Sequence, residues 1–239
     1  MLSITHTKNL TGAIVSGDYW DLDELNHAIY AVIGEEGKYY DLEGSRARIL
    51  KVCHDFRQSS QGERNIEFVK NGLHKDSMKE HDLVAPEKNV YFTVEILWPE
   101  LIFAAIALND FIKLYQKNHS FPLLDAHVTT IRKFQSAVGA SLSETLDEEE
   151  FQNFMKLLNN QETNVHKYAI QFVDVLNLNY IKMTKEQREE SLGKYALKLA
   201  VQDNEYVAFR NQVIKSANVT KSTIHDLALT AEYPEDIEW

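Results

Sequence analysis

The sequence predicts an α+β protein, in which a small, mostly antiparallel sheet packs with a larger all-helical part. Three observations support this fold class. Seven of the nine glycines precede residue 73, and glycine is frequent where a chain reverses direction often. After Trp98, apolar residues recur at the three- and four-residue spacing of helices. All four prolines fall at the boundaries of expected elements.

The first part, residues 1–98, is predicted to follow the order β-β-α-α-β-β. Asp18 has the position and side chain of an N-cap, and Gly34 ends the helix that Asp18 begins. Cys53 is expected on the buried face of the second helix. The predicted elements are strands at 2–6 and 12–16, helices at 18–34 and 45–59, and strands at 65–70 and 90–97.

The second part, residues 99–233, is predicted to be entirely helical. Pro99 is placed at the first turn of its most apolar helix, where a missing N–H costs nothing. Thr145 and Thr184 each begin a capping-box pattern. The predicted helices are 99–115, 125–140, 145–158, 164–180, 184–199, 204–217 and 221–231. Residues 234–239 are expected to be a loose tail unless Trp239 docks on the body.

Composition and charge limit the function classes. The chain has 239 residues and a net charge of −11, spread evenly, which disfavours phosphate backbones and anionic lipids as partners unless a local basic patch exists. The single cysteine, Cys53, excludes an intramolecular disulfide and favours a reducing compartment. The first residues lack a signal-peptide pattern, and the longest apolar run, 101–108, is too short to span a bilayer. We expect a cytoplasmic protein.

Two stretches have a recognisable sequence. They are Ser16-Gly17-Asp18-Tyr19-Trp20-Asp21-Leu22 in the first part, and Asn89-Val90-Tyr91-Phe92 with the following Trp98-Pro99-Glu100 and Ala107-Leu108-Asn109-Asp110-Phe111. The chain resembles an uncharacterised family of bacterial proteins known only as a domain of unknown function. The resemblance implies a bacterial cytosolic protein, and it implies no activity, ligand or catalytic residue.

One segment, 204–229, has the pattern of a helix-turn-helix, which would bind nucleic acid. A cap and groove-facing side chains would come from Thr220, Lys221, Ser222, Thr223 and His225. Two features oppose this interpretation. Bulky Ile214 stands where the tight helix crossing needs a small residue, and residues 203–231 carry only three Lys or Arg against three acids. The alternative is an ordinary helical hairpin that closes a bundle.

Charged residues offer a second kind of candidate site. Arg46 and Arg57 are three helical turns apart, so they share a face of the second helix, and Arg64 follows it. Together they could hold a phosphate or carboxylate, although such a stripe is more often solvated. Glu95 and Asp110 interrupt an apolar strand and an apolar helix, and a convergent pair would be an acid–base candidate. The plainer interpretation puts Glu95 in solvent and Asp110 on a polar edge.

No catalytic, metal-binding or cofactor-binding motif is present in the sequence, so no catalytic residue, metal or cofactor is assigned. Aromatic residues make up 10% of the chain, enough to anchor an interface. The leading hypothesis is a non-catalytic protein that acts through protein–protein contacts or self-association. A helix-turn-helix nucleic-acid binder is second, and an enzyme or small-anion-binding protein is third.

Overall fold

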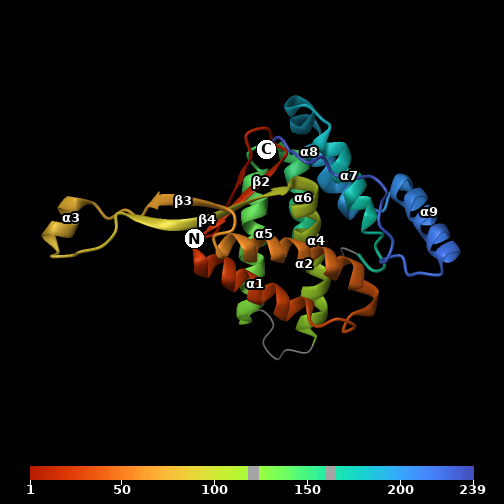
Figure 1. Ribbon diagram of the computed structural model, residues 1–239, viewed down its shortest axis with the longest axis horizontal. Coiled ribbons are helices and arrows are strands. Elements are labelled where there is room, and N and C mark those ends of the chain that lie inside the picture. The colour runs from red at the N-terminus through yellow and green to blue at the C-terminus, as the bar shows by residue number, and fades with distance from the viewer. Residues whose placement is uncertain (118–123, 160–164) are drawn as a thin grey trace.

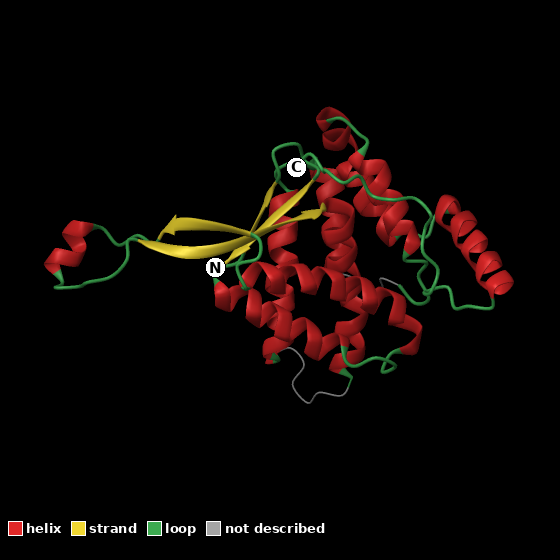
Figure 2. Ribbon diagram, in the orientation of Figure 1, coloured by secondary structure: helices red, strands yellow, loops and turns green. Residues whose placement is uncertain are grey.

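The computed structural model describes residues 1–117, 124–159 and 165–239, and it confirms the α+β fold class (Figures 1 and 2). A small antiparallel sheet lies beside a large helical body. The strands are β1 (Ser3–His6), β2 (Gly12–Gly17), β3 (Asn65–Lys70) and β4 (Lys88–Leu97). The helices described are α1 (Tyr19–Ile33), α2 (Glu43–Ser60), α3 (Lys75–Glu80), α4 (Trp98–Gln116), α5 (Ala126–Leu142), α6 (Glu148–Asn159), α7 (Gln171–Ile181), α8 (Lys185–Ala200) and α9 (Asn204–Thr220).

The strand order in the sheet is β1-β2-β4-β3, and every pairing is antiparallel. β4 is the longest strand and has different neighbours along its two halves. Its inner residues 92–97 pair with β2, whereas its outer residues 88–93 pair with β3. The overlap is so small that β3 and the outer half of β4 extend past the rest of the sheet.

Local signals position several helices as the sequence predicts. Asp18 accepts a hydrogen bond from the backbone N–H of Asp21 at 2.9 Å, and the Asp21 carboxylate accepts one from the backbone N–H of Asp18 at 3.2 Å. Thr184 and Gln187 form the same reciprocal box at α8. The predicted box at Thr145 is displaced. Asp147 caps α6, because its carboxylate accepts from the N–H of Glu150 at 2.8 Å.

The core surrounds α4, whose residues 101–109 are all buried. This helix contacts α1 and α2 of the first part and α5, α6, α7 and α8 of the second. Cys53 is fully buried in this core, as expected, and burial raises the pKa of its thiol to about 12. One continuous apolar cluster therefore runs across residue 98, and the division of the chain at that residue stays a prediction.

The C-terminal segment differs from the prediction. The helix expected over 221–231 is not formed, because the chain leaves α9 through Lys221 in the left-handed conformation (φ 55°) and continues as turns and extended backbone. Ile224 and Leu227, whose spacing suggested a helix, pack against the core from an irregular chain. The Gln171 side-chain amide donates to both of their carbonyl oxygens at 2.6 Å, so these groups are satisfied without a helix.

The predicted tail, residues 234–239, contacts the body at two points. Thr11 donates a side-chain hydrogen bond to the carbonyl of Glu238, and the Trp239 ring lies against Gly12. Across the described ranges, no helix is both long and apolar enough to cross a membrane.

Candidate functional site

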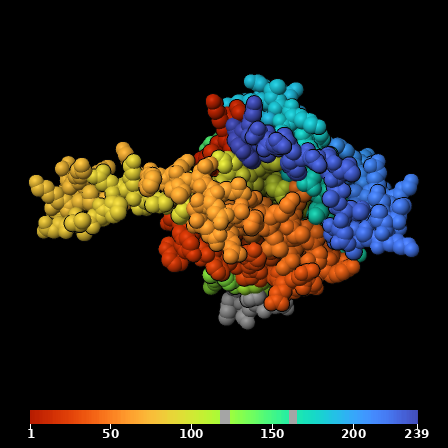
Figure 3. All heavy atoms as spheres, viewed as in Figure 1, coloured from red at the N-terminus to blue at the C-terminus, as the bar shows by residue number. Residues whose placement is uncertain are grey.

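The most distinctive feature of the molecule is an arm, residues 65–92, that comprises β3, α3 and the outer half of β4. It projects from one side of the body as a thin extension (Figures 1 and 3). None of residues 61–90, all of which the structure describes, is buried. The tip is nevertheless ordered by its own hydrogen bonds. The Asn71 side chain donates to the carbonyl of Pro86 at 2.8 Å, and the N–H of Leu83 donates to the carbonyl of Met78 at 2.8 Å.

One face of the arm is apolar, and we call it the arm face: Ile66, Phe68, Val90 and Phe92. The strand register creates it, because residues directly opposite each other lie on one side of a sheet. Ile66 is opposite Phe92, and Phe68 is opposite Val90. The other side carries the pairs Glu67–Tyr91 and Val69–Asn89. The Phe68 side chain is 66% exposed, an unusual position for a large apolar residue.

The arm face continues the buried face of the central sheet. Val94 and Ile96 have the same parity along β4 as Val90 and Phe92, and side chains two apart point the same way. Val94 and Ile96 are buried among the core residues, whereas Val90 is 43% exposed. The apolar side of β4 is therefore buried in the body, but it extends into the arm, where no helix of the described chain covers it.

The base and the end of the arm differ in charge. Lys70 and Lys88 are opposite each other at the outer end of the arm face. At the base, Gly17 pairs with Phe92, and the chain then enters α1 through the exposed pair Tyr19 and Trp20. Their rings meet edge to face at 5.1 Å. The acidic residues Asp18, Asp21, Asp23 and Glu24 lie in the same stretch.

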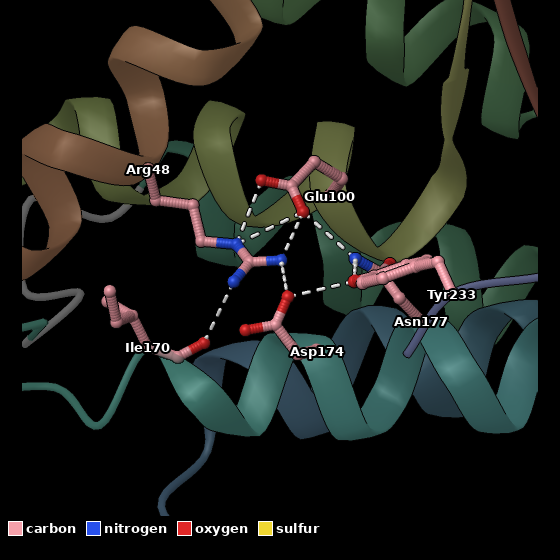
Figure 4. A network of polar contacts seen from close by, with 6 residues as sticks. All are labelled: Arg48, Glu100, Ile170, Asp174, Asn177 and Tyr233. Carbon is pink, nitrogen blue, oxygen red and sulfur yellow. Dashed lines mark hydrogen bonds and ion pairs between the residues drawn. The ribbon is translucent and has the colours of Figure 1, made fainter. Parts of the chain in front are cut away.

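A second feature is a buried ion cluster around Arg48, which sequence reasoning missed (Figure 4). Arg48 projects from α2 and is only 3% exposed. Its guanidinium bonds Glu100 of α4 through Nε at 2.8 and 3.0 Å and also through Nη2. Nη2 donates to Asp174 of α7 at 2.8 Å, and Nη1 donates to the carbonyl of Ile170 at 3.1 Å. The cluster joins three helices.

Electrostatics stabilise this cluster in its ionised form. Burial acts to lower the pKa of Arg48, but Glu100 and Asp174 outweigh it and raise that pKa. Burial likewise acts to raise the pKa of Asp174, yet the bond from Arg48 leaves it below the ordinary value. Asn177 donates to Glu100 at 2.9 Å, and the Tyr233 hydroxyl donates to Asp174 at 2.8 Å. The C-terminal segment is thus attached to the cluster, which we interpret as a structural clasp.

The predicted anion-binding arginines do not form one site. Arg46 donates through Nε to the carbonyl of Gly34 at 3.0 Å, which helps to end α1. Arg64 pairs with Asp55 at 2.9 Å on the surface. Arg57 is exposed and lines a different cleft, beside Tyr19. Each arginine therefore serves a separate place, and the Arg46, Arg57 and Arg64 anion site stays a prediction without support from geometry.

The predicted acid pair is also separated. Glu95 accepts a hydrogen bond from the Asn65 side chain at 3.1 Å and shares a cleft of about 320 Å³ with Arg64. Asp110 lies in another cleft, with Tyr39 and His166, and accepts from the backbone N–H of Val165 at 2.7 Å. Burial raises the pKa of Asp110 to about 6. The two carboxylates line different clefts and so do not act as a pair.

The five residues proposed to contact nucleic acid do not lie on a recognition helix. Thr220 is the last residue of α9 and bonds back to Ser216 at 3.0 Å, so it caps no following helix. Thr223 bonds Asp226 at 2.8 Å in a turn. His225 packs against the backbone of Gly44, and burial lowers its pKa. Lys221 and Ser222 belong to the intervening turn. Residues 221–231 therefore do not form the second helix of a helix-turn-helix, and nucleic-acid binding by these five residues stays a prediction.

No signal in the chain distinguished Arg48 from its neighbours, because its partners are 52 and 126 residues away. In the parts of the chain that the structure describes, no group of three or more His, Cys, Asp or Glu side chains could hold a metal ion.

The fold and these sites define a small α+β protein with an apolar arm and a clasped C-terminal segment. The family comparison agrees with the resemblance seen in the sequence. The chain matches the model of a domain of unknown function, DUF6904, over residues 2–239, and it belongs to that family. Comparisons with curated proteins and with solved structures gave no match.

Proposed function

We propose that this protein acts through self-association, and that the arm face is the contact between two copies of the chain. The observation that carries the proposal is the continuation of the sheet's buried side into the arm without a covering layer. Exposed apolar side chains gathered on one surface are typical of protein interfaces. Phe68 is the most exposed of the four and would be the central anchor.

A two-fold arrangement of antiparallel arms fits the distribution of charge. Stacking one arm face on another places the outer end of each arm over the base of its partner. Lys70 and Lys88 of one copy then approach the acidic start of α1, around Asp18 and Glu24, in the other. The arm holds four lysines and five acids, whereas the whole chain carries −11, so contact between two arms brings little net charge together.

The test is the mass of the protein in solution. Analytical ultracentrifugation of the wild type should give twice the chain mass of 27.6 kDa, with dissociation on dilution. Phe68→Lys should give the monomer mass, because a lysine at the centre of the interface would bury an unpaired charge.

Val69→Lys is the matched control. It adds the same charge to the next residue of β3, on the side of the arm opposite the arm face. We expect it to remain a dimer. Both residues lie outside the buried core, so circular dichroism spectra should show the same folded secondary structure in both variants. A wild type that is a monomer at all concentrations would refute the proposal, as would equal dissociation of the two variants.

A further inference from the structure

A cleft of about 660 Å³ lies between α4, α5 and α6, far along the chain from the arm. That size is typical of sites for small molecules. Its walls include apolar side chains from two helices, Val128 of α5 and Met155 and Leu158 of α6. Arg132 of α5 and Lys156 of α6 also line it, and no Asp or Glu occurs among its described lining residues. The described lining residues of this cleft therefore carry only positive charge, although the whole chain carries −11.

Arg132 is held in the cleft by neutral groups. Its Nη1 donates to the side-chain oxygen of Asn109 at 2.6 Å and to that of Gln135 at 2.7 Å. Asn109 and Gln135 are themselves buried, at 0% and 3% exposure. The Gln135 amide donates to the carbonyl of Ala105 at 2.7 Å and to Asn109 at 3.1 Å. This chain of amides fixes the guanidinium without neutralising it.

The hydrogen bonds that Arg132 makes within the described residues all use one nitrogen of the guanidinium. Within residues 1–117, 124–159 and 165–239, Nη1 of Arg132 is the atom that carries its hydrogen bonds, and no carboxylate pairs with it. Nε and Nη2 form the side-on edge, whose two parallel N–H groups match the two oxygens of a carboxylate. Burial lowers the pKa of Arg132, as expected for a cation that lacks an acidic partner.

We infer that this cleft binds a small organic carboxylate with an apolar body. The carboxylate would accept two hydrogen bonds from Nε and Nη2 of Arg132, and Lys156 at the rim would add a second positive charge. The apolar body would lie against Val128, Met155 and Leu158. The buried amides of Asn109 and Gln135 act as positioning groups, because they orient the fork before the ligand arrives.

The experiment uses the whole chain and isothermal titration calorimetry. The probes are benzoate and hexanoate, each compared with its neutral amide, benzamide or hexanamide, and with inorganic phosphate. The wild type should bind at least one of the two carboxylates and should bind the corresponding amide on the order of 10- to 100-fold more weakly, since hydrogen bonds to charged groups give that discrimination. Arg132→Gln should weaken carboxylate binding by a similar factor. Arg57→Gln, which changes an exposed arginine in another cleft, should leave it unchanged.

The comparison of acid and amide in the wild type keeps the inference testable even where Arg132→Gln fails to fold. Equal affinity for acid and amide would overturn it, because the Arg132 guanidinium would then make no contribution to binding. Absence of binding by either carboxylate would also overturn it, and binding of phosphate alone would overturn the assignment to carboxylates. None of these outcomes depends on whether the protein self-associates.

Discussion

Replacing Arg48 with methionine tests whether the clasp beneath the C-terminal segment stabilises the fold. Methionine keeps much of the apolar stem and removes the charged head, so the change isolates the ion cluster from the packing around it. Glu100 and Asp174 would lose their cation while they stay 14% and 21% exposed. Breaking a buried ion pair on one side costs about 3–5 kcal/mol. Because water reaches both carboxylates in part, we expect the lower end, about 3 kcal/mol at pH 7.

The pH dependence supplies a sharper test than the magnitude. In the wild type the pKa of Asp174 is depressed, so its contribution to stability is present above the unfolded value of 3.8 and is lost as the pH falls. In Arg48→Met, burial acts on Asp174 without the opposing cation and raises the pKa of that carboxyl, so protonation relieves the cost. The difference in unfolding free energy between the two proteins should therefore shrink as the pH falls from 7 towards 4.

Urea unfolding followed by circular dichroism measures both the loss of unfolding free energy and its dependence on pH. For a chain of this size, about 3 kcal/mol corresponds to a fall in Tm of roughly 6–12 °C. Arg57→Met is the control on the same helix, and it should change stability by less than about 0.5 kcal/mol because Arg57 is exposed. A loss below about 1 kcal/mol in Arg48→Met, or a loss that does not vary between pH 4 and 7, would refute this account of the cluster.

Three further outcomes follow from single side chains. Burial raises the pKa of Asp110 to about 6, so ionisation of this carboxyl destabilises the fold as the pH rises from about 4 through 6. Asp110→Asn should therefore flatten the curve of unfolding free energy against pH in that range. A curve parallel to that of the wild type would contradict this. Tyr233→Phe removes a hydrogen bond of 2.8 Å to Asp174. It should lower the unfolding free energy in urea by about 1 kcal/mol and speed proteolysis within residues 224–239. Tyr40→Phe, on the open surface, should do neither. Cys53 is fully buried with a pKa of about 12, so a thiol reagent should modify it only as fast as the chain unfolds, and rapid labelling under native conditions would contradict its placement.

Sequence reasoning succeeded where the cause of a structure is local. Asp18 and Thr184 begin helices through contacts three residues away, and such contacts can be recognised from the chain alone. It failed at 221–231, where the apolar residues have the spacing of a helix but the backbone is irregular. Lys221 leaves the helical conformation, and Gln171, more than fifty residues earlier, satisfies the freed carbonyl groups. Spacing shows which side chains are buried, but it does not show which distant amide replaces a helix's own hydrogen bonds.

The same limit explains the candidate sites. Asn109 was visible as a polar interruption in the most apolar helix, but its role depends on Arg132 and Gln135, which reach it only after α4 and α5 pack. Arg46 and Arg48 are two residues apart on one helix, yet one caps a neighbouring helix and the other is buried between two carboxylates. A charge in the sequence becomes a site only through the partners that the fold brings to it.

Strand β4 shows most directly why a sequence pattern gives the face of a sheet but not its surroundings. Its alternation of apolar and polar residues is unbroken from Val90 to Ile96, and it is the pattern of a strand buried on one side. Helices cover that side at Val94 and Ile96, and the described chain leaves it open at Val90. Val90, at the open end, does not contribute to the buried core of a single chain. Val90 lies on the same side of β4 as the buried residues Val94 and Ile96. We therefore expect another surface to cover Val90, and in our proposal that surface is the arm face of a second copy.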